Sequence, residues 1–278
     1  MTSSDLTTPS AYAVERVRHA IRARMLTVRD ISKVTPQLVR VTFHSPDLEG
    51  FVSASFDDHI KLFFPADGIP ILPTPSEQGL AFPEGAQRPP TRDYTPRSYR
   101  ATQNELDIEF VLHGDGPAAN WVSRAKVGDQ LVIAGPRGSF VIPDTFNWLW
   151  LIGDETALPA IARRLEELPS GASATVVALV QNASEQQSFS TKANAQIHWV
   201  HRDEQNAATG DPLEAAVRQL DIPASGEGYI WAAGEAAQMR AIHQYLTKEK
   251  GIAKTRIRAS SYWKKGAAAV HETLGADS

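Results

Sequence analysis

The chain has 278 residues, of which 42% are hydrophobic and 22% are charged, a composition typical of globular proteins and sufficient for one large domain or two medium ones. Its formal net charge of −4 argues against a general nucleic-acid-binding protein, because that function needs a broad basic face. There is no cysteine, which excludes disulfides, cysteine-ligated iron–sulfur clusters and thiol redox chemistry within the chain, so a redox function would need a bound organic cofactor.

Residues 1–21 are polar and basic, and we expect them to form a solvated tail that ends in a short helix. They contain no apolar segment of signal-peptide length, and no run of about 18 apolar residues occurs anywhere in the chain. The sequence therefore predicts a cytoplasmic protein that does not enter a membrane.

Residues 22–143 have the pattern of an antiparallel β-barrel. β-branched and aromatic residues alternate or cluster between turn signals at 25–34, 38–45, 57–64, 105–112 and 129–136. Many short strands with few helices are typical of such a barrel. The stretch from 65 to 91 contains seven prolines and no periodicity. A loop of that length is either a flap over a site or a lengthened hairpin.

Residues 146–278 change to alternating strands and helices. Strands are predicted at 148–153, 174–181, 196–202, 228–234 and 256–263, and helices near 158–168, 212–220 and 235–250. This alternation predicts a parallel sheet with helices on both faces. The expected fold is an antiparallel barrel followed by an α/β domain, with a substrate cleft between them.

The stretch RDYTPR at residues 92–97 has the residue types of a flavin site. Arg92 and Arg97 offer planar, permanently charged donors that suit a pyrophosphate. Tyr94 and Thr95 offer an aromatic face and a short hydroxyl group beside which a flavin ring could lie. The alternative to a flavin site is an ordinary structural strand with an exposed arginine.

The stretch VLHGDGPAANW at residues 111–121 is a candidate phosphate turn, because backbone N–H groups at a helix N-terminus attract anions. The turn residues are Gly114, Gly116, Pro117 and Ala118. His113 comes directly before them and is either a cofactor contact or a strand-end histidine. Trp121 is either a core residue or a wall of an adenine site.

The stretch GDETALPA at residues 153–160 follows a buried-looking strand. Ligands in open α/β sheets bind at the carboxyl ends of the strands, so Asp154, Glu155 and Thr156 are candidate ligand contacts. The alternative is that acidic and hydroxyl groups cap the following helix.

Together with WAAGE (231–235) and YWKKG (262–266), these segments resemble the siderophore-interacting protein family, which is related to the wider ferredoxin-NADP reductase superfamily. The resemblance runs from about residue 22 to residue 266. It implies a Greek-key FAD-binding barrel and a nicotinamide-binding α/β domain. The activity it implies is transfer of electrons from NADH or NADPH, or alternatively from a ferredoxin, to siderophore-chelated Fe(III).

The resemblance also implies roles for individual residues of the flavin site. The family's arginine at the position of Arg92 holds a flavin phosphate. The tyrosine at Tyr94 packs on the ring or the ribityl chain, and the hydroxyl of Thr95 approaches flavin N5. Tyr262 and Trp263 either belong to the core or cover the flavin face that a nicotinamide must displace.

On the nicotinamide side, the resemblance places Thr156 and Ala157 where nicotinamide and flavin meet, with Gly234 and Glu235 lining the same crevice. Asp154 and Glu155 depart from the glycine-rich pattern of the superfamily, which weakens the nicotinamide assignment. Arginines that could select a 2′-phosphate are Arg163, Arg164 and Arg202.

Four basic residues are either solvated surface charges or a pocket that holds anionic ferric siderophores by electrostatics; they are Lys61, Arg137, Lys264 and Lys265. The histidines show no metal-ligand spacing, so no metal site of the protein itself is expected and iron should arrive already chelated. A monomer is expected. Two other functions stay open: a general flavin or ferric reductase that uses free flavin, and a non-catalytic siderophore carrier.

Overall fold

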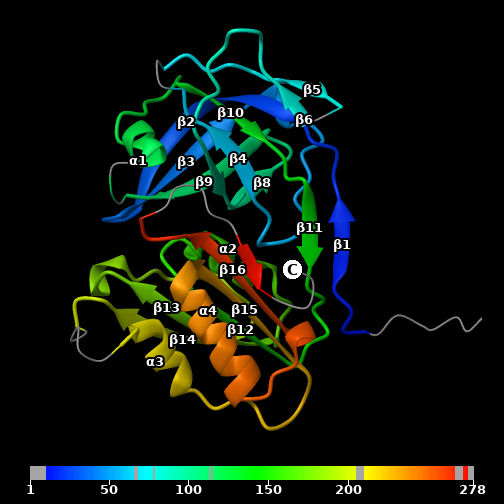
Figure 1. The fold of residues 1–278 in the computed structure, drawn as a ribbon, viewed down its shortest axis with the longest axis vertical. Coiled ribbons are helices and arrows are strands. Elements are labelled where there is room, and N and C mark those ends of the chain that lie inside the picture. Colours follow the sequence, from blue (N-terminus) through cyan, green and yellow to red (C-terminus); the bar gives the residue numbers. More distant parts are fainter. Residues whose placement is uncertain are drawn as a thin grey trace, which may run out of the picture.

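The computed structural model describes residues 11–65, 68–77, 79–112, 114, 116–204, 210–266 and 272–274. Figure 1 shows a β-rich upper lobe from the N-terminal half of the chain and an α/β lower lobe from the C-terminal half. A ribbon of two strands, β1 (Glu15–Arg18) and β11 (Gly138–Val141), lies beside the junction of the lobes. Within the described part of the chain, no helix is both long and apolar enough to cross a bilayer.

The upper lobe is a seven-stranded antiparallel sheet with the order β7-β4-β10-β2-β3-β9-β8. Its strands are β2 (Ala23–Thr35), β3 (Leu38–His44), β4 (Ile60–Phe63), β7 (Thr91–Tyr94), β8 (Ser98–Arg100), β9 (Glu105–Val111) and β10 (Gln130–Ala134). Helix α1 (Pro117–Val122) follows β9. A separate hairpin of β5 (Thr74–Ser76) and β6 (Gly79–Ala81) lies within the proline-rich stretch.

The two edge strands of this sheet, β7 and β8, are consecutive in the chain. Only residues 95–97 join them. The four Cα–Cα steps from Tyr94 to Ser98 span at most roughly 14 Å, so the two edges must lie close together and the sheet curls back on itself. The RDYTPR stretch therefore forms the seam of a barrel-like sheet, filled by a core that includes Val41, Phe43 and Phe110.

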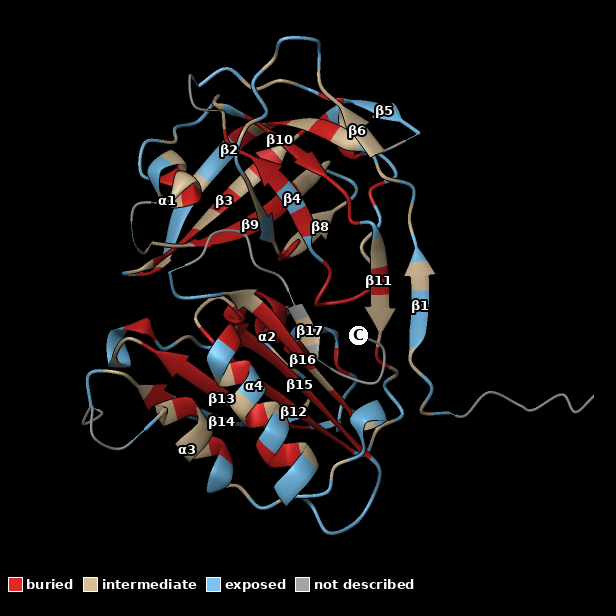
Figure 2. Ribbon diagram, viewed as in Figure 1, coloured by how far each residue is buried: buried red, intermediate tan, exposed pale blue. Residues whose placement is uncertain are grey.

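The lower lobe is a sheet with five parallel strands, β14-β13-β12-β15-β16, and the antiparallel strand β17 at its edge. The strands are β12 (Trp148–Asp154), β13 (Ser173–Val180), β14 (Asn194–His201), β15 (Gly228–Glu235), β16 (Ile257–Trp263) and β17 (Glu272–Leu274). The helices are α2 (Leu158–Glu167), α3 (Pro212–Arg218) and α4 (Ala236–Gln244). All residues of β12 are buried, as expected for a strand covered on both faces (Figure 2).

Alternation along β12 explains the two faces of this sheet. Leu149 and Leu151 point into the core beneath α2, while Trp150 and Ile152 join the core beneath α3 and α4. The predicted fold class, an antiparallel barrel followed by a parallel-sheet domain, is confirmed. The predicted helix in the N-terminal tail is wrong, because residues 15–18 are a strand that satisfies its backbone groups by pairing with β11.

A loop of the barrel, residues 51–59, is built into the lower lobe. Phe56 is 1% exposed and belongs to the core beneath α2, where its ring lies 5.2 Å from that of Trp231. Next to it, Asp57 accepts hydrogen bonds from Trp231 Nε1 at 3.2 Å and from Arg258 Nε at 2.8 Å. The two lobes therefore share one core at this point.

Truncating Phe56 should test this shared core. Phe56→Ala is expected to lower the free energy of unfolding by about 3–5 kcal/mol, because it leaves a cavity in a closely packed interior. Val52→Ala on the same loop, where the side chain is 52% exposed, is the control and should change it by less than about 0.5 kcal/mol. Chemical denaturation of both variants measures the difference. Equal effects would contradict the shared core.

Candidate flavin and nicotinamide site

The first half of the seam carries the aromatic and cationic groups of the proposed flavin site. Tyr94 packs its ring 4.6 Å from that of Phe110, and burial raises the pKa of its hydroxyl, so it stays neutral. Arg92 is half-buried and donates to the carbonyl of Thr91 at 2.8 Å. No described carboxylate pairs with its guanidinium, which leaves it suited to an anion such as a phosphate.

The second half of the seam is held by the lower lobe. The carbonyl of Pro96 accepts from Arg163 Nη1 at 3.0 Å, and the side chain of Thr95 interacts with the hydroxyl of Tyr262. Arg97 forms a bidentate ion pair with Glu166 at 2.8 and 2.6 Å. The sequence suggested that Arg97 binds a pyrophosphate, but in this structure its guanidinium is engaged by a carboxylate of α2.

The candidate phosphate turn lies directly before α1. Gly114 has φ +60, a conformation that favours glycine, and Gly116 caps the helix without a side-chain hydrogen bond. The sequence also places Pro117 and Ala118 in the first turn, as observed. His113 lies outside the described residues. The phosphate role of this turn stays a prediction.

Trp121 of α1 is partly buried against the barrel core. Its ring lies 6.0 Å from that of Phe43, 5.9 Å from that of Phe110 and 6.2 Å from that of Phe64. These contacts favour the core interpretation over a wall of an adenine site.

Asp154 ties together the carboxyl ends of three strands of the parallel sheet. One carboxylate oxygen, Oδ1, accepts from the backbone N–H of Thr156 at 2.9 Å and from its hydroxyl at 2.5 Å. The other, Oδ2, accepts from the backbone N–H of Glu235 at 3.1 Å and from Trp263 Nε1 at 2.7 Å. Asp154 is fully buried, so its role in this structure is to organise neighbouring candidates, including Thr156.

Gly234 is required at this junction. Its φ is +154, and a Cβ atom there would lie 2.8 Å from Asp154 Oδ2. The register shift between Gly234 and Glu235 leaves Tyr262 as an extra residue of β16, a bulge that redirects side chains. Tyr262 thereby reaches Thr95 of the barrel while Trp263 reaches Asp154.

The remaining charged candidates are mostly paired. Lys61 forms an ion pair with Asp93 at 2.7 Å, and Arg137 is exposed at the corner before β11. Lys264 and Lys265 are exposed after β16, and the backbone N–H of Lys265 donates to Glu235 at 3.2 Å. Among the described residues, no shared partner links these four cations, so the basic pocket stays a prediction. The arginines proposed to select a 2′-phosphate have internal partners: Arg163 with Glu167, Arg164 with Asp144 and Arg202 with Glu155.

Comparison with known proteins identifies the family. A family model described as siderophore-interacting FAD-binding domain matches residues 27–140, and one described as siderophore-interacting protein matches residues 146–266. The NADPH-dependent ferric-chelate reductase of Escherichia coli is 36% identical over 253 residues, which cover 90% of this chain and 96% of that protein. The chain belongs to the siderophore-interacting protein family.

Other family members agree with this assignment. The ferric vibriobactin reductase of Vibrio cholerae is 37% identical over 237 residues, covering 84% of this chain and 86% of that protein. The crystal structure of a siderophore utilization protein from T. fusca superposes with a TM-score of 0.84 at 36% identity, covering 93% of this chain and 98% of that one.

Sequence reasoning missed the residues by which the lobes of this family member hold each other. Glu166 lies in the helix predicted near 158–168 and Asp57 in the strand predicted at 57–64, and neither residue was singled out as a contact between the lobes. One signal in the sequence was available: Phe56, a large apolar residue, stands directly before the charged residues Asp57 and Asp58. Arg97, the partner of Glu166, and Trp231 and Arg258, the partners of Asp57, are far away in sequence, so only the fold reveals these contacts.

Asp58 should make stability depend on pH. Burial raises the pKa of its carboxyl, despite hydrogen bonds from Ser139, Ser53 and Ser55 that all reach one oxygen, Oδ2. The folded state therefore binds this proton more tightly than the unfolded state, and the cost of the buried charge disappears as pH falls through the folded pKa. Asp58→Asn should gain stability relative to wild type at pH 7 and lose that advantage toward pH 4. Denaturant titrations across this range measure the difference, and a constant difference would contradict the assignment.

Replacing Asp154 should test its role as an acceptor for donors from β15, β16 and the turn before α2. Asp154→Asn keeps the shape but turns one acceptor into a donor that faces N–H groups, and each buried group left unsatisfied costs about 1–3 kcal/mol. We expect a loss of about 2–4 kcal/mol in unfolding free energy. The control Asp221→Asn, at an exposed position, should change it by less than about 0.5 kcal/mol. Thermal unfolding of both variants decides; equal losses would show that the four contacts of Asp154 contribute little.

Proposed function

We propose that this protein is an FAD-dependent ferric-siderophore reductase that takes electrons from NADPH or NADH. The proposal rests on family membership and on one structural observation. The seam that contains Arg92, Tyr94 and Thr95 adjoins the α/β domain: Arg163 and Glu166 of α2 are hydrogen-bonded to Pro96 and Arg97, and Tyr262 of β16 interacts with Thr95. An electron relay needs this juxtaposition of a flavin site and a nicotinamide site.

The residues present fit FAD. The guanidinium of Arg92 would pair with a phosphate, and the ring of Tyr94 would lie against the isoalloxazine or the ribityl chain. The hydroxyl of Thr95 would approach N5, and backbone groups of residues 114–118 would meet the second phosphate. These roles come from the family resemblance. They are supported by the guanidinium of Arg92, with which no described carboxylate pairs, and by the start of α1, which has no side-chain cap.

The nicotinamide would lie at the carboxyl ends of β12 and β15, where parallel sheets bind ligands. Thr156, Ala157, Gly234 and Glu235 line this end of the sheet. Asp154 would keep Thr156 and Trp263 in fixed positions, and Tyr262 and Trp263 would border the flavin. When bound, FAD would accept a hydride and return its two electrons singly, which a nicotinamide cannot do.

The substrate would be an anionic iron chelate, attracted by the exposed cations Arg137, Lys264 and Lys265 and by Lys61 beside Asp93. Iron bound by a siderophore is therefore substrate, and its reduction to Fe(II) would loosen the chelate. We place this reaction in the cytoplasm, where nicotinamides are available, and assign it to a monomer. A ferredoxin is the alternative donor, because Asp154 and Glu155 replace the glycine-rich pattern of the superfamily.

The purified protein should be yellow, should lose its colour when NADPH or NADH is added without oxygen, and should regain it on addition of a ferric siderophore. Arg92→Ala should weaken FAD binding about tenfold to hundredfold, because a charge-assisted hydrogen bond is lost. Arg88→Ala, an exposed arginine four positions earlier, should bind FAD like wild type. Titration of the apo-protein with FAD measures both variants.

Three results would contradict the proposal: a colourless protein that takes up no FAD, a flavin that no donor reduces, or a reduced flavin that ferric chelates do not reoxidise. Bleaching by reduced ferredoxin but by neither nicotinamide would keep the reductase and replace its donor.

A further inference from the structure

Helix α2 of the lower lobe forms hydrogen bonds and an ion pair with the seam of the barrel. Arg163 and Glu166 lie three residues apart on α2 and reach the same short segment. Arg163 Nη1 donates to the carbonyl of Pro96 at 3.0 Å, and its two Nη atoms bind the hydroxyl and carbonyl of Ser53 at 2.8 and 2.9 Å. Glu166 holds Arg97 through both carboxylate oxygens.

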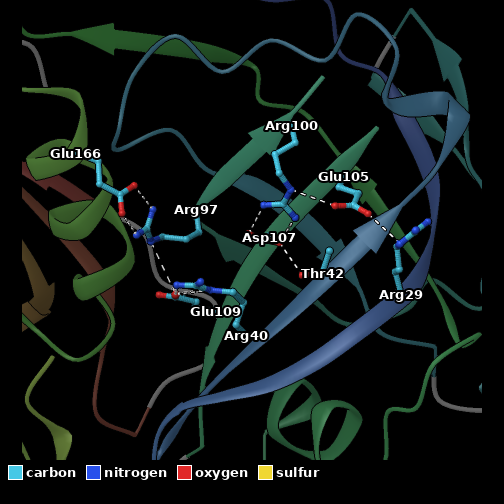
Figure 3. Close-up of polar contacts among 9 residues, drawn as sticks. All are labelled: Arg29, Arg40, Thr42, Arg97, Arg100, Glu105, Asp107, Glu109 and Glu166. Atoms are coloured by element: carbon cyan, nitrogen blue, oxygen red, sulfur yellow. Dashed lines mark hydrogen bonds and ion pairs between the residues drawn. The ribbon is translucent and has the colours of Figure 1, made fainter. Parts of the chain in front are cut away.

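The ion pair between Arg97 and Glu166 is one end of a row of alternating charges, shown in Figure 3. Arg40 holds Glu109 at 2.5 and 3.0 Å, Arg97 Nε lies 3.8 Å from the same Glu109 oxygen, and Glu166 closes the row. The side chain of Glu109 is 0% exposed and that of Glu166 is 39% exposed. The row therefore runs from the partly exposed Arg40, through the buried Glu109 and Arg97 on the side of the sheet opposite the barrel core, to the surface of α2.

Arg97 depends on this row for its charge and position. Burial by itself would lower its pKa, but the hydrogen bonds that it donates to Glu166 and the charges of Glu109, Glu166 and Asp107 outweigh burial and raise it. A buried guanidinium needs acceptors, and a bidentate carboxylate fixes it in one plane. Glu166 therefore sets the orientation of Arg97, and with it the backbone between β7 and β8.

We propose that Glu166 and Arg163 are positioning residues for the flavin: from α2 they fix the Thr95–Arg97 connection and so place Tyr94 and Thr95 against the isoalloxazine. This inference rests on the proposed function. The side chains of both residues are engaged by Arg97, Pro96 and Ser53, so the role assigned to them is indirect, through the seam. Helix α2, which begins beside the proposed nicotinamide site, thereby sets the position of the residues proposed to contact the flavin.

The test compares two bidentate ion pairs of the same kind. Glu166→Ala removes the pair at the seam, while Glu249→Ala removes the exposed pair with Arg218, whose two bonds are each 2.8 Å and lie away from the junction. Three quantities are measured for each variant: the Kd for FAD by quenching of flavin fluorescence, the limiting rate of anaerobic bleaching by NADPH, and the melting temperature.

Glu166→Ala should weaken FAD binding about threefold to tenfold. It should also lower the limiting bleaching rate about tenfold or more, since small misplacements of reacting groups are costly, and change the apparent Kd for NADPH less than about threefold. Glu249→Ala should match wild type in all three measurements. Arg163→Met should change the bleaching rate in the same direction as Glu166→Ala.

The inference is overturned if Glu166→Ala and Glu249→Ala have the same FAD affinity and bleaching rate. It is also overturned if Glu166→Ala only lowers the melting temperature. If the alanine variant does not fold, Glu166→Gln, which keeps the side-chain volume and one acceptor oxygen, takes its place in the same comparison. A wild-type protein that binds no FAD refutes the proposed function instead, so the two failures are distinguishable.

Discussion

The connection of three residues between β7 and β8 constrains both the barrel and its contact with the other lobe. It brings the two edges of the sheet together, and it contains a buried arginine that needs carboxylates around it. Glu109 supplies one from strand β9 of the barrel, and Glu166 supplies the other from α2. The same side chain, Arg97, therefore takes part both in closing the sheet and in docking the α/β domain.

A second buried charge organises the lower lobe in a similar way. Asp154 occupies the position where parallel sheets leave an open crevice, and its carboxylate collects donors from β15 and β16 and from the turn before α2. Each of its oxygens has two partners, which offsets the cost of burying the charge. The bulge at Tyr262 then directs one aromatic side chain to the barrel and the next to Asp154.

These two charge centres explain how the protein could support electron transfer with no side chain needed as nucleophile or general acid. The protein's contribution is to hold two surfaces at a fixed separation and orientation. Phe56 and Asp57 add a third connection, because a barrel loop enters the core beneath α2. A joint formed by packing and buried ion pairs favours a fixed arrangement of the two lobes over a hinge between them.

The sequence by itself determined the fold class, the family and most candidate residues. Strand periodicity is local, and the five motifs lie within short stretches of chain, so both can be recognised without tertiary contacts. The strand at residues 15–18, the engagement of Arg97 by Glu166 and the insertion of Phe56 could not be predicted in this way. Each depends on partners between 69 and 175 residues away, and only the folded chain brings those residues together.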